Sequence, residues 1–86
     1  MHTVYVLLSI VDGRTYTGCT NNIERRFKDH NTGKEISTKA RKPFKLIYTE
    51  SYDDLSSARK REIYLKTGKG KEFLDSKSGT PKVEKK

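Results

Sequence analysis

Residues 4–18 read VYVLLSIVDGRTYTG, and this stretch decides the fold. It opens with an apolar run rich in β-branched and aromatic residues, which predicts a strand over Val4–Ser9. Asp12-Gly13 is a strong turn pair, and the polar-aromatic alternation returns over Arg14–Gly18 around Tyr16. The stretch therefore predicts an antiparallel hairpin closed by a short loop.

Beyond the hairpin, helical and extended patterns follow one another. Candidate N-caps at residues 20–22 and a stop signal at 31–33 predict a helix from about Asn22 to His30. The polar segment Lys34–Pro43 has no periodicity, which predicts a loop. Phe44–Tyr52 then alternates again and predicts a third strand.

Side chains alternate along a strand, so the third strand should present Phe44, Leu46 and Tyr48 on one face. A second helix is predicted from Leu55 to Lys66, and a short third helix around residues 71–74. The order strand, strand, helix, strand, helix, helix predicts a small α/β sandwich of the α+β type. Its three-stranded antiparallel sheet should be flanked by helices.

Length and composition limit the chain to one small domain. It has 86 residues, of which 31% are hydrophobic, so the core must be thin. We expect a folded domain over residues 1–75 and a basic disordered tail over 76–86, where four lysines face one glutamate. The single cysteine, Cys19, excludes an internal disulfide and a cysteine-rich zinc site. Without a long apolar run or a secretion signal, we expect a soluble, cytoplasmic protein, and we expect a monomer.

The charge balance suits a polyanionic partner. The net charge is +8, from 19 basic and 11 acidic residues, and lysines and arginines displace counterions from phosphates. Solubility alone could also explain this excess. The candidates for contacts to a nucleic-acid backbone are the basic side chains in and after the predicted loop: Lys39, Arg41, Lys42 and Lys45. The alternative is a solvated basic loop with no partner.

The second predicted helix carries a carboxylate in its apolar stripe. At the helical period, Glu62 falls among Leu55, Ala58 and Leu65. An ionised carboxylate at such a position is costly unless it is paired or bound to a metal ion. Glu62 is therefore a candidate metal ligand. The alternatives are a structural salt bridge, or a helix tilted enough for Glu62 to reach water.

The first predicted helix repeats this pattern. Ile23 and Phe27 define its apolar face, and Arg26 and His30, four residues apart, lie along the edge of that face. His30 could instead be a core histidine bonded to a backbone carbonyl. Arg26 could be a surface arginine with a buried stem.

The predicted hairpin adds two tyrosines, each of which is ordinary in a strand when taken alone. The sum is less ordinary, because a tiny domain with few apolar residues places several polar groups on its inner faces. Polar groups gathered at such a cost indicate a site. The candidate site residues are Tyr5, Tyr16, Arg26, His30 and Glu62.

These residues also resemble the motifs of the GIY-YIG nuclease superfamily. Within it, the chain is similar to short single-domain bacterial members related to the catalytic domain of the excision-repair endonuclease C-subunit. The motifs run in order over residues 3–74: Thr3-Val4-Tyr5, Tyr16-Thr17-Gly18, Arg26 eight residues beyond Gly18, His30-Asn31, Lys42–Tyr48 and Ala58–Glu62. Thr3 and Thr17 depart from the usual glycine and isoleucine. Lys69-Gly70-Lys71 stands where many members place a polar residue.

The resemblance implies a divalent-metal-dependent endonuclease that hydrolyses DNA phosphodiester bonds, with DNA repair as a setting. Glu62 would hold one Mg²⁺ or Mn²⁺, since it is the only carboxylate placed for metal. Tyr5 would deprotonate the attacking water, helped by nearby positive charge that favours phenolate. Arg26 would stabilise the transition state, Tyr16 would orient water or phosphate, and His30 would hydrogen-bond to a tyrosine or phosphate oxygen.

Two other functions stay open. A domain of this fold could hold nucleic acid without cutting it. An adaptor could use the same basic surface for an acidic protein partner, although this would leave the polar constellation unexplained.

Overall fold

The structure, a computed structural model, describes residues 1–78 and contains one sheet with helices on both sides. The three strands are antiparallel and lie in the order β2-β1-β3. The elements in chain order are β1 (His2–Ser9), β2 (Thr15–Thr20), α1 (Ile23–Thr32), the 3₁₀ helix η1 (Ile36–Arg41), β3 (Phe44–Tyr52), α2 (Leu55–Leu65) and α3 (Gly68–Ser78). The predicted α+β fold and the order of its strands and α-helices are therefore confirmed.

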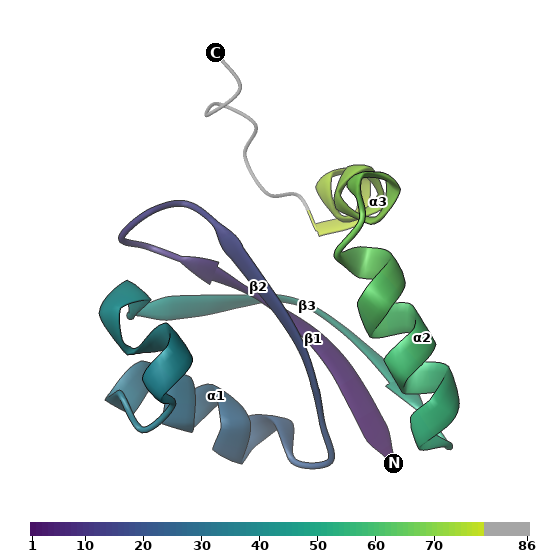
Figure 1. Ribbon diagram of the computed structural model, residues 1–86, viewed down its shortest axis with the longest axis horizontal. Helices are drawn as coiled ribbons and strands as arrows, with labels where there is room; N and C mark the ends of the chain where they lie inside the picture. Colours follow the sequence, from purple (N-terminus) through teal and green to yellow (C-terminus); the bar gives the residue numbers. More distant parts are fainter. Residues whose placement is uncertain (79–86) are drawn as a thin grey trace.

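The central strand β1 supplies both cores, because its side chains alternate between the two faces of the sheet. Val4 and Val6 are fully buried against α2 and α3. Tyr5 and Leu7 are buried on the opposite face, with Phe44, beneath α1. Figure 1 shows α1 on one side of the sheet and the α2–α3 pair on the other. Each core is thin, as the composition predicts.

The helix starts follow the predicted caps. The Asn22 side chain accepts a hydrogen bond from the backbone N–H of Arg25 at 3.1 Å, and α1 begins at the next residue after this cap. Gly33 ends the helix with a left-handed φ of 86°. At α2, the Asp54 side chain accepts from the Ser57 N–H at 2.7 Å. Local sequence therefore sets both entry points.

Helix α3 is longer than the predicted 71–74 because it packs closely against the end of α2. A Cβ on Gly70 would lie 2.1 Å from the Tyr64 carbonyl oxygen, so only glycine allows this approach. The helix reaches Ser78, three residues into the predicted tail. The remaining tail residues, 79–86, lie outside the described residues. Among the helices of residues 1–78, none has the length and hydropathy that spanning a membrane requires.

Two local predictions were wrong. The predicted loop Lys34–Pro43 contains the 3₁₀ helix η1, which long-range contacts from Thr38 to His30 and from Arg41 to Asp12 hold in place. Such contacts leave no periodicity in the sequence, which is why the segment was predicted to be a loop.

The second wrong prediction concerns the faces of β3. Val6 pairs with Tyr48 but Leu7 pairs with Leu46, so Ile47 is an extra residue in a β-bulge. The bulge shifts the alternation, so Phe44 packs on the α1 side while Tyr48 packs against the α2–α3 core. The predicted shared face of Phe44, Leu46 and Tyr48 does not exist.

Candidate active site

A chain of three buried polar side chains runs from β1 through α1 to η1. The Tyr5 hydroxyl lies 3.0 Å from His30 Nε2, and His30 Nδ1 lies 2.7 Å from Thr38 Oγ1. Tyr5, His30 and Thr38 are each no more than 1% exposed. Burial at this level makes each hydrogen bond important to the fold, because a buried polar group that loses its partner is costly.

The end of this chain favours one direction for its protons. The Glu35 carbonyl oxygen lies 3.4 Å from Thr38 Oγ1 and can accept the hydroxyl proton, which allows the Thr38 oxygen to accept from His30 Nδ1–H. His30 Nε2 then carries the lone pair, and it accepts from the Tyr5 O–H. Both ring nitrogens of His30 are therefore bonded to side-chain hydroxyls, and not to a backbone carbonyl, which was the alternative.

Gly18 explains how the Tyr5 hydroxyl reaches this position. The two residues are paired across β1 and β2, and a Cβ on Gly18 would lie 2.5 Å from the Tyr5 hydroxyl oxygen. A side chain at residue 18 would displace the hydroxyl from His30. The glycine of the Tyr16-Thr17-Gly18 signature therefore makes room for the tyrosine of the first signature.

Aromatic rings enclose the histidine. The Tyr16 ring centroid lies 4.9 Å from that of His30 and 6.4 Å from that of Tyr5, and Phe44 meets His30 edge-on at 5.8 Å. Asn31, the partner in the His30-Asn31 motif, accepts from the backbone N–H of Phe44 and donates to its carbonyl. Asn31 thus fastens α1 to β3 and fixes the wall beside His30.

Arg26 brings a positive charge to the Tyr5 end of the chain. Its guanidinium hydrogen-bonds to the Tyr5 hydroxyl, and its Nη2 lies 2.8 Å from Glu35 Oε1. The Arg26 and Glu35 side chains are 34% and 26% exposed, so this pair is at the surface while Tyr5 is beneath it. Sequence reasoning missed Glu35 and Thr38, because both lie in a polar segment where no periodicity marks an inward position.

The protonation states follow from burial and from these charges. Burial raises the pKa of Tyr5 to about 12, although the hydrogen bond from Arg26 opposes the shift. The Arg26 charge favours the phenolate of Tyr5, in the expected direction, but burial outweighs it. Burial and the Arg26 charge hold the pKa of His30 below its usual value, so the imidazole is neutral near pH 7.

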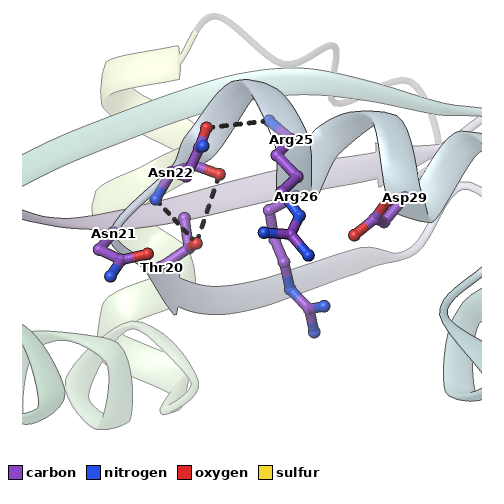
Figure 2. Close-up of a pocket in the computed structure, with 6 residues that line it drawn as sticks. All are labelled: Thr20, Asn21, Asn22, Arg25, Arg26 and Asp29. Carbon is purple, nitrogen blue, oxygen red and sulfur yellow. Dashed lines mark hydrogen bonds between the residues drawn. The ribbon is translucent and has the colours of Figure 1, made fainter.

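Two hollows adjoin Arg26. The α1 hollow, of about 140 Å³, lies at the start of α1, and Figure 2 shows Arg25 and Arg26 between Asn21 and Asp29 on its wall. The interhelix hollow, of about 400 Å³, has walls from both α1 and α2. Its lining includes His2, Cys19, Thr20, Arg26, Leu55 and Arg59. Arg26 thus joins the buried chain to open space.

Glu62 lies on the other side of the sheet, on α2. Its side chain is 17% exposed and pairs with Lys66 Nζ at 3.1 Å, and its charge acts on Cys19 of β2. Ala58 and Leu65 are buried beside it, but Leu55, predicted to share their face, is 46% exposed. The structure brings Tyr5, Tyr16, Arg26 and His30 together, and it places Glu62 apart from them on α2.

The basic residues predicted to contact the nucleic-acid backbone lie near the C-terminal end of α1, at the opposite end from the α1 hollow. Arg41 Nε is paired with Asp12 Oδ2 at 3.0 Å, and its guanidinium lies over the Phe44 ring, so it connects η1 to the hairpin turn. The stems of Lys39 and Lys42 pass beside Gly33, and Lys45 is exposed on β3. Their role in phosphate binding stays a prediction.

Comparison with known proteins identifies the family of this chain. The family model described as the GIY-YIG catalytic domain matches residues 1–74. A UPF0213 protein of Bacillus licheniformis is 48% identical over 76% of this chain and 67% of its own length. A UPF0213 protein of Natronomonas pharaonis is 43% identical over 77% of this chain and 78% of its own.

A solved structure shares the fold. The solution NMR structure of a UPF0213 protein from Bacillus halodurans is 38% identical, with a TM-score of 0.57, over 91% of this chain and 86% of that one. A GIY-YIG domain implies nucleic acid as the partner class. The chain belongs to the GIY-YIG family, and it is similar to small UPF0213 proteins.

Proposed function

We propose that this protein is a divalent-metal-dependent endonuclease that hydrolyses phosphodiester bonds of DNA. The observation that supports this most directly is the buried chain Tyr5–His30–Thr38, which ends at a guanidinium on an open hollow. Hydrolysis needs a proton acceptor next to a positive charge for the phosphate, and this arrangement supplies both.

The proton route follows from the hydrogen-bond directions. A water molecule at the Tyr5 hydroxyl gives its proton to the phenol oxygen while Tyr5 passes its own proton to His30 Nε2. With a pKa of about 12, Tyr5 does not ionise first, so it acts as a relay and neutral His30 is the final acceptor. The resulting hydroxide attacks phosphorus, and the bond from phosphorus to the leaving oxygen breaks. Thr38 keeps Nδ1 protonated throughout.

Arg26 serves the phosphate. In the structure its guanidinium is paired with the Glu35 carboxylate, at a partly exposed position. A phosphate oxygen is also an anionic acceptor, so it can take the place of Glu35 on Arg26. The guanidinium would then neutralise the charge that develops as hydroxide adds. Tyr16, in ring contact with His30, would orient the water.

Glu62 is the residue that would hold the metal ion. Among residues 1–78, no cluster of three or more histidine, cysteine or acidic side chains is placed to bind one. A single carboxylate fits Mg²⁺ or Mn²⁺, which retain water ligands and take the rest from substrate phosphate. Such an ion would supply charge stabilisation at the leaving oxygen. Lys66 must release Glu62 for this, and at 54% exposure it is free to turn to solvent.

Nicking of supercoiled plasmid in Mg²⁺ or Mn²⁺, with EDTA as the blank, tests the proposal. Glu62→Ala should abolish nicking and leave DNA binding in EDTA largely intact, while Glu72→Ala, which removes an exposed carboxylate of α3, should cut normally. Wild-type nicking that persists in EDTA would refute metal dependence. A folded Glu62→Ala protein that cuts at the wild-type rate would refute the role of Glu62.

The alternative is a domain that binds nucleic acid without cutting it. It predicts DNA binding with no nicking under any metal, and it leaves the buried proton chain without a function.

A further inference from the structure

The proposed chemistry uses only the Arg26 side of the interhelix hollow and gives the rest of its wall no role. Residues from the start of β1, from the end of β2 and from both flanking helices form its wall. Arg26 enters from α1 and Arg59 from α2, and His2 and Thr20 add polar groups between them. None of the described residues that line it is acidic. The hollow is therefore suited to an anion.

Arg59 differs from the other structured arginines of its region. Arg61, two residues on, is paired with Glu50 and lies over two aromatic rings, and Arg41 is paired with Asp12. Within residues 1–78, Arg59 has no ion-pair or hydrogen-bond partner, and its side chain is exposed. A guanidinium held over a hollow with its five donors unused is available for a ligand.

Helix α2 aligns this guanidinium with Glu62. Leu55, Arg59 and Glu62 are spaced by four and three residues, which places them on one stripe of the helix. Cys19 also lines the hollow, together with the arginines of the two helices. Arg59 therefore lies on the wall of the hollow and within one helical turn of Glu62.

We infer that one strand of the DNA crosses the interhelix hollow, with its reacting phosphate at Arg26 and a neighbouring phosphate held by Arg59. This inference rests on the proposed function and adds a substrate contact to it. It also moves the main backbone contact away from η1, since Lys39 and Lys42 lie at the far end of α1.

The single cysteine of the chain provides a test that needs no mutation. Cys19 lines the hollow and is partly exposed, so iodoacetamide can report whether DNA covers it. The probe is a fluorescein-labelled DNA oligonucleotide, single-stranded or duplex, in EDTA. At DNA about tenfold above Kd, alkylation of Cys19 should slow by about tenfold, because only unbound protein reacts. High salt, which releases the DNA, should restore the rate.

Arg59→Gln tests the contact itself, with Lys60→Gln as the matched control. Both changes remove one exposed positive charge from α2, but Lys60 does not line the hollow. Arg59→Gln should weaken binding and lower the slope of log K against log salt by about 0.9 on duplex DNA, or about 0.7 on a single strand. Lys60→Gln should leave the slope near that of wild type.

Three results would overturn the inference. The first is an unchanged rate of Cys19 alkylation when DNA saturates the protein. The second is an Arg59→Gln slope equal to that of Lys60→Gln. The third is a slope lost in a Lys39→Gln/Lys42→Gln double variant and kept in Arg59→Gln, which would assign the backbone to η1. If the wild type cuts DNA in each case, the proposed function survives. A wild type that neither binds nor cuts DNA refutes both.

Discussion

The two faces of the sheet each carry an arginine, a glutamate and a tyrosine in contact, and the two clusters behave differently. On the α2–α3 side, Arg61 grips both oxygens of Glu50, at 2.9 and 3.1 Å, and the hydroxyls of Tyr48 and Tyr52 donate to the same carboxylate. The Arg61 guanidinium lies 4.6 Å from the centroid of the Phe73 ring. Every group has its partners, so this cluster is a fastener between β3 and α2.

On the α1 side the same residue types border open space at the surface. Arg26 pairs with Glu35 at 2.8 Å, touches Tyr5, and lines both hollows. Next to Tyr5 lie His30, which can accept a proton, and Thr38, which holds His30 in position.

The α2–α3 cluster, by contrast, is closed. Burial alone would raise the pKa of Glu50, yet the hydrogen bonds from Arg61 and the tyrosines hold it below its usual value. Residue types do not identify a site; access and a proton acceptor do.

The largest predicted difference between the clusters concerns their tyrosines. Tyr5→Phe removes the relay oxygen, and cleavage should fall by roughly 10²–10⁴-fold, the range of general-base catalysis. Tyr16→Phe should lose less, since solvent can replace an orienting hydroxyl, and Tyr48→Phe should leave the rate constant near wild type. Single-turnover rates across a metal titration measure this. Faster cutting by Tyr5→Phe than by Tyr16→Phe at saturating metal would transfer the role to Tyr16.

The arginines should separate activity from stability. Arg26→Ala should reduce cleavage by roughly 10²–10³-fold, as for a lost transition-state donor, with little change in unfolding. Arg61→Ala should do the reverse: it leaves the Glu50 carboxylate short of donors, which costs about 1–3 kcal/mol, while the folded fraction still cuts. Urea unfolding and single-turnover assays on both variants give the result. Equal losses of activity in the two variants would remove the distinction between the clusters.

Thr38 tests the proton direction in the open cluster. Thr38→Val removes the acceptor of His30 Nδ1–H, and the unpaired buried donor should cost about 1–3 kcal/mol of unfolding free energy. The ¹⁵N shifts of the imidazole should show loss of the Nδ1-protonated tautomer. If the tautomer equilibrium moves by about 1.4 kcal/mol, cleavage falls by about tenfold. Thr38→Ser keeps the hydroxyl and should restore both readouts. An unchanged tautomer in Thr38→Val would contradict the assigned direction.

The smallest effect is the dependence on pH. The pKa of folded His30 is below its usual value of about 6.5, so the unfolded chain binds the proton more readily. Its contribution to stability is complete above about pH 6.5 and is lost as the pH falls through the folded pKa. The acid limb of the cleavage rate should likewise lie below pH 6.5. The imidazole is surrounded by other polar and charged side chains, namely Tyr16, Arg26, Asp29 and Glu35. The variant His30→Gln keeps these neighbours and removes only the imidazole, so comparison with it shows which part of the acid limb comes from His30. An acid limb above pH 6.5 would exclude neutral His30 as the acceptor.

The sequence predicts the framework of the fold well because local rules determine it. The cap residues Asn22 and Asp54 stand where the helices begin, and alternation defines β3 at Phe44–Tyr52. The inward tyrosines, Arg26 and His30 follow from periodicity in the same way, since each lies on a regular element.

What the sequence does not predict depends on contacts between distant residues. Thr38 is buried because η1 folds back onto α1, and Glu35 meets Arg26 because the same turn carries it there. No spacing within Lys34–Pro43 encodes either contact. Arg59 is similar, since its role depends on the hollow that α1 and α2 form together. A helical pattern in the sequence predicts the direction in which a side chain leaves its own helix. It does not predict which residue of another element that side chain will meet.

The extra residue at Ile47 divides β3 into two parts that serve opposite faces of the sheet. Before it, the strand contributes Phe44 to the wall around His30; after it, the strand contributes Tyr48, Glu50 and Tyr52 to the Arg61 fastener. At the bulge Leu46 stays opposite Leu7 and Tyr48 stays opposite Val6, so the residues on either side of Ile47 keep their pairing with β1. Recombination between relatives at this residue would exchange the fastener together with Arg59 and Glu62, and it would leave Tyr5, Arg26 and His30 in place. The bulge therefore separates the segment that carries the buried proton chain from the segment that carries the fastener and Glu62.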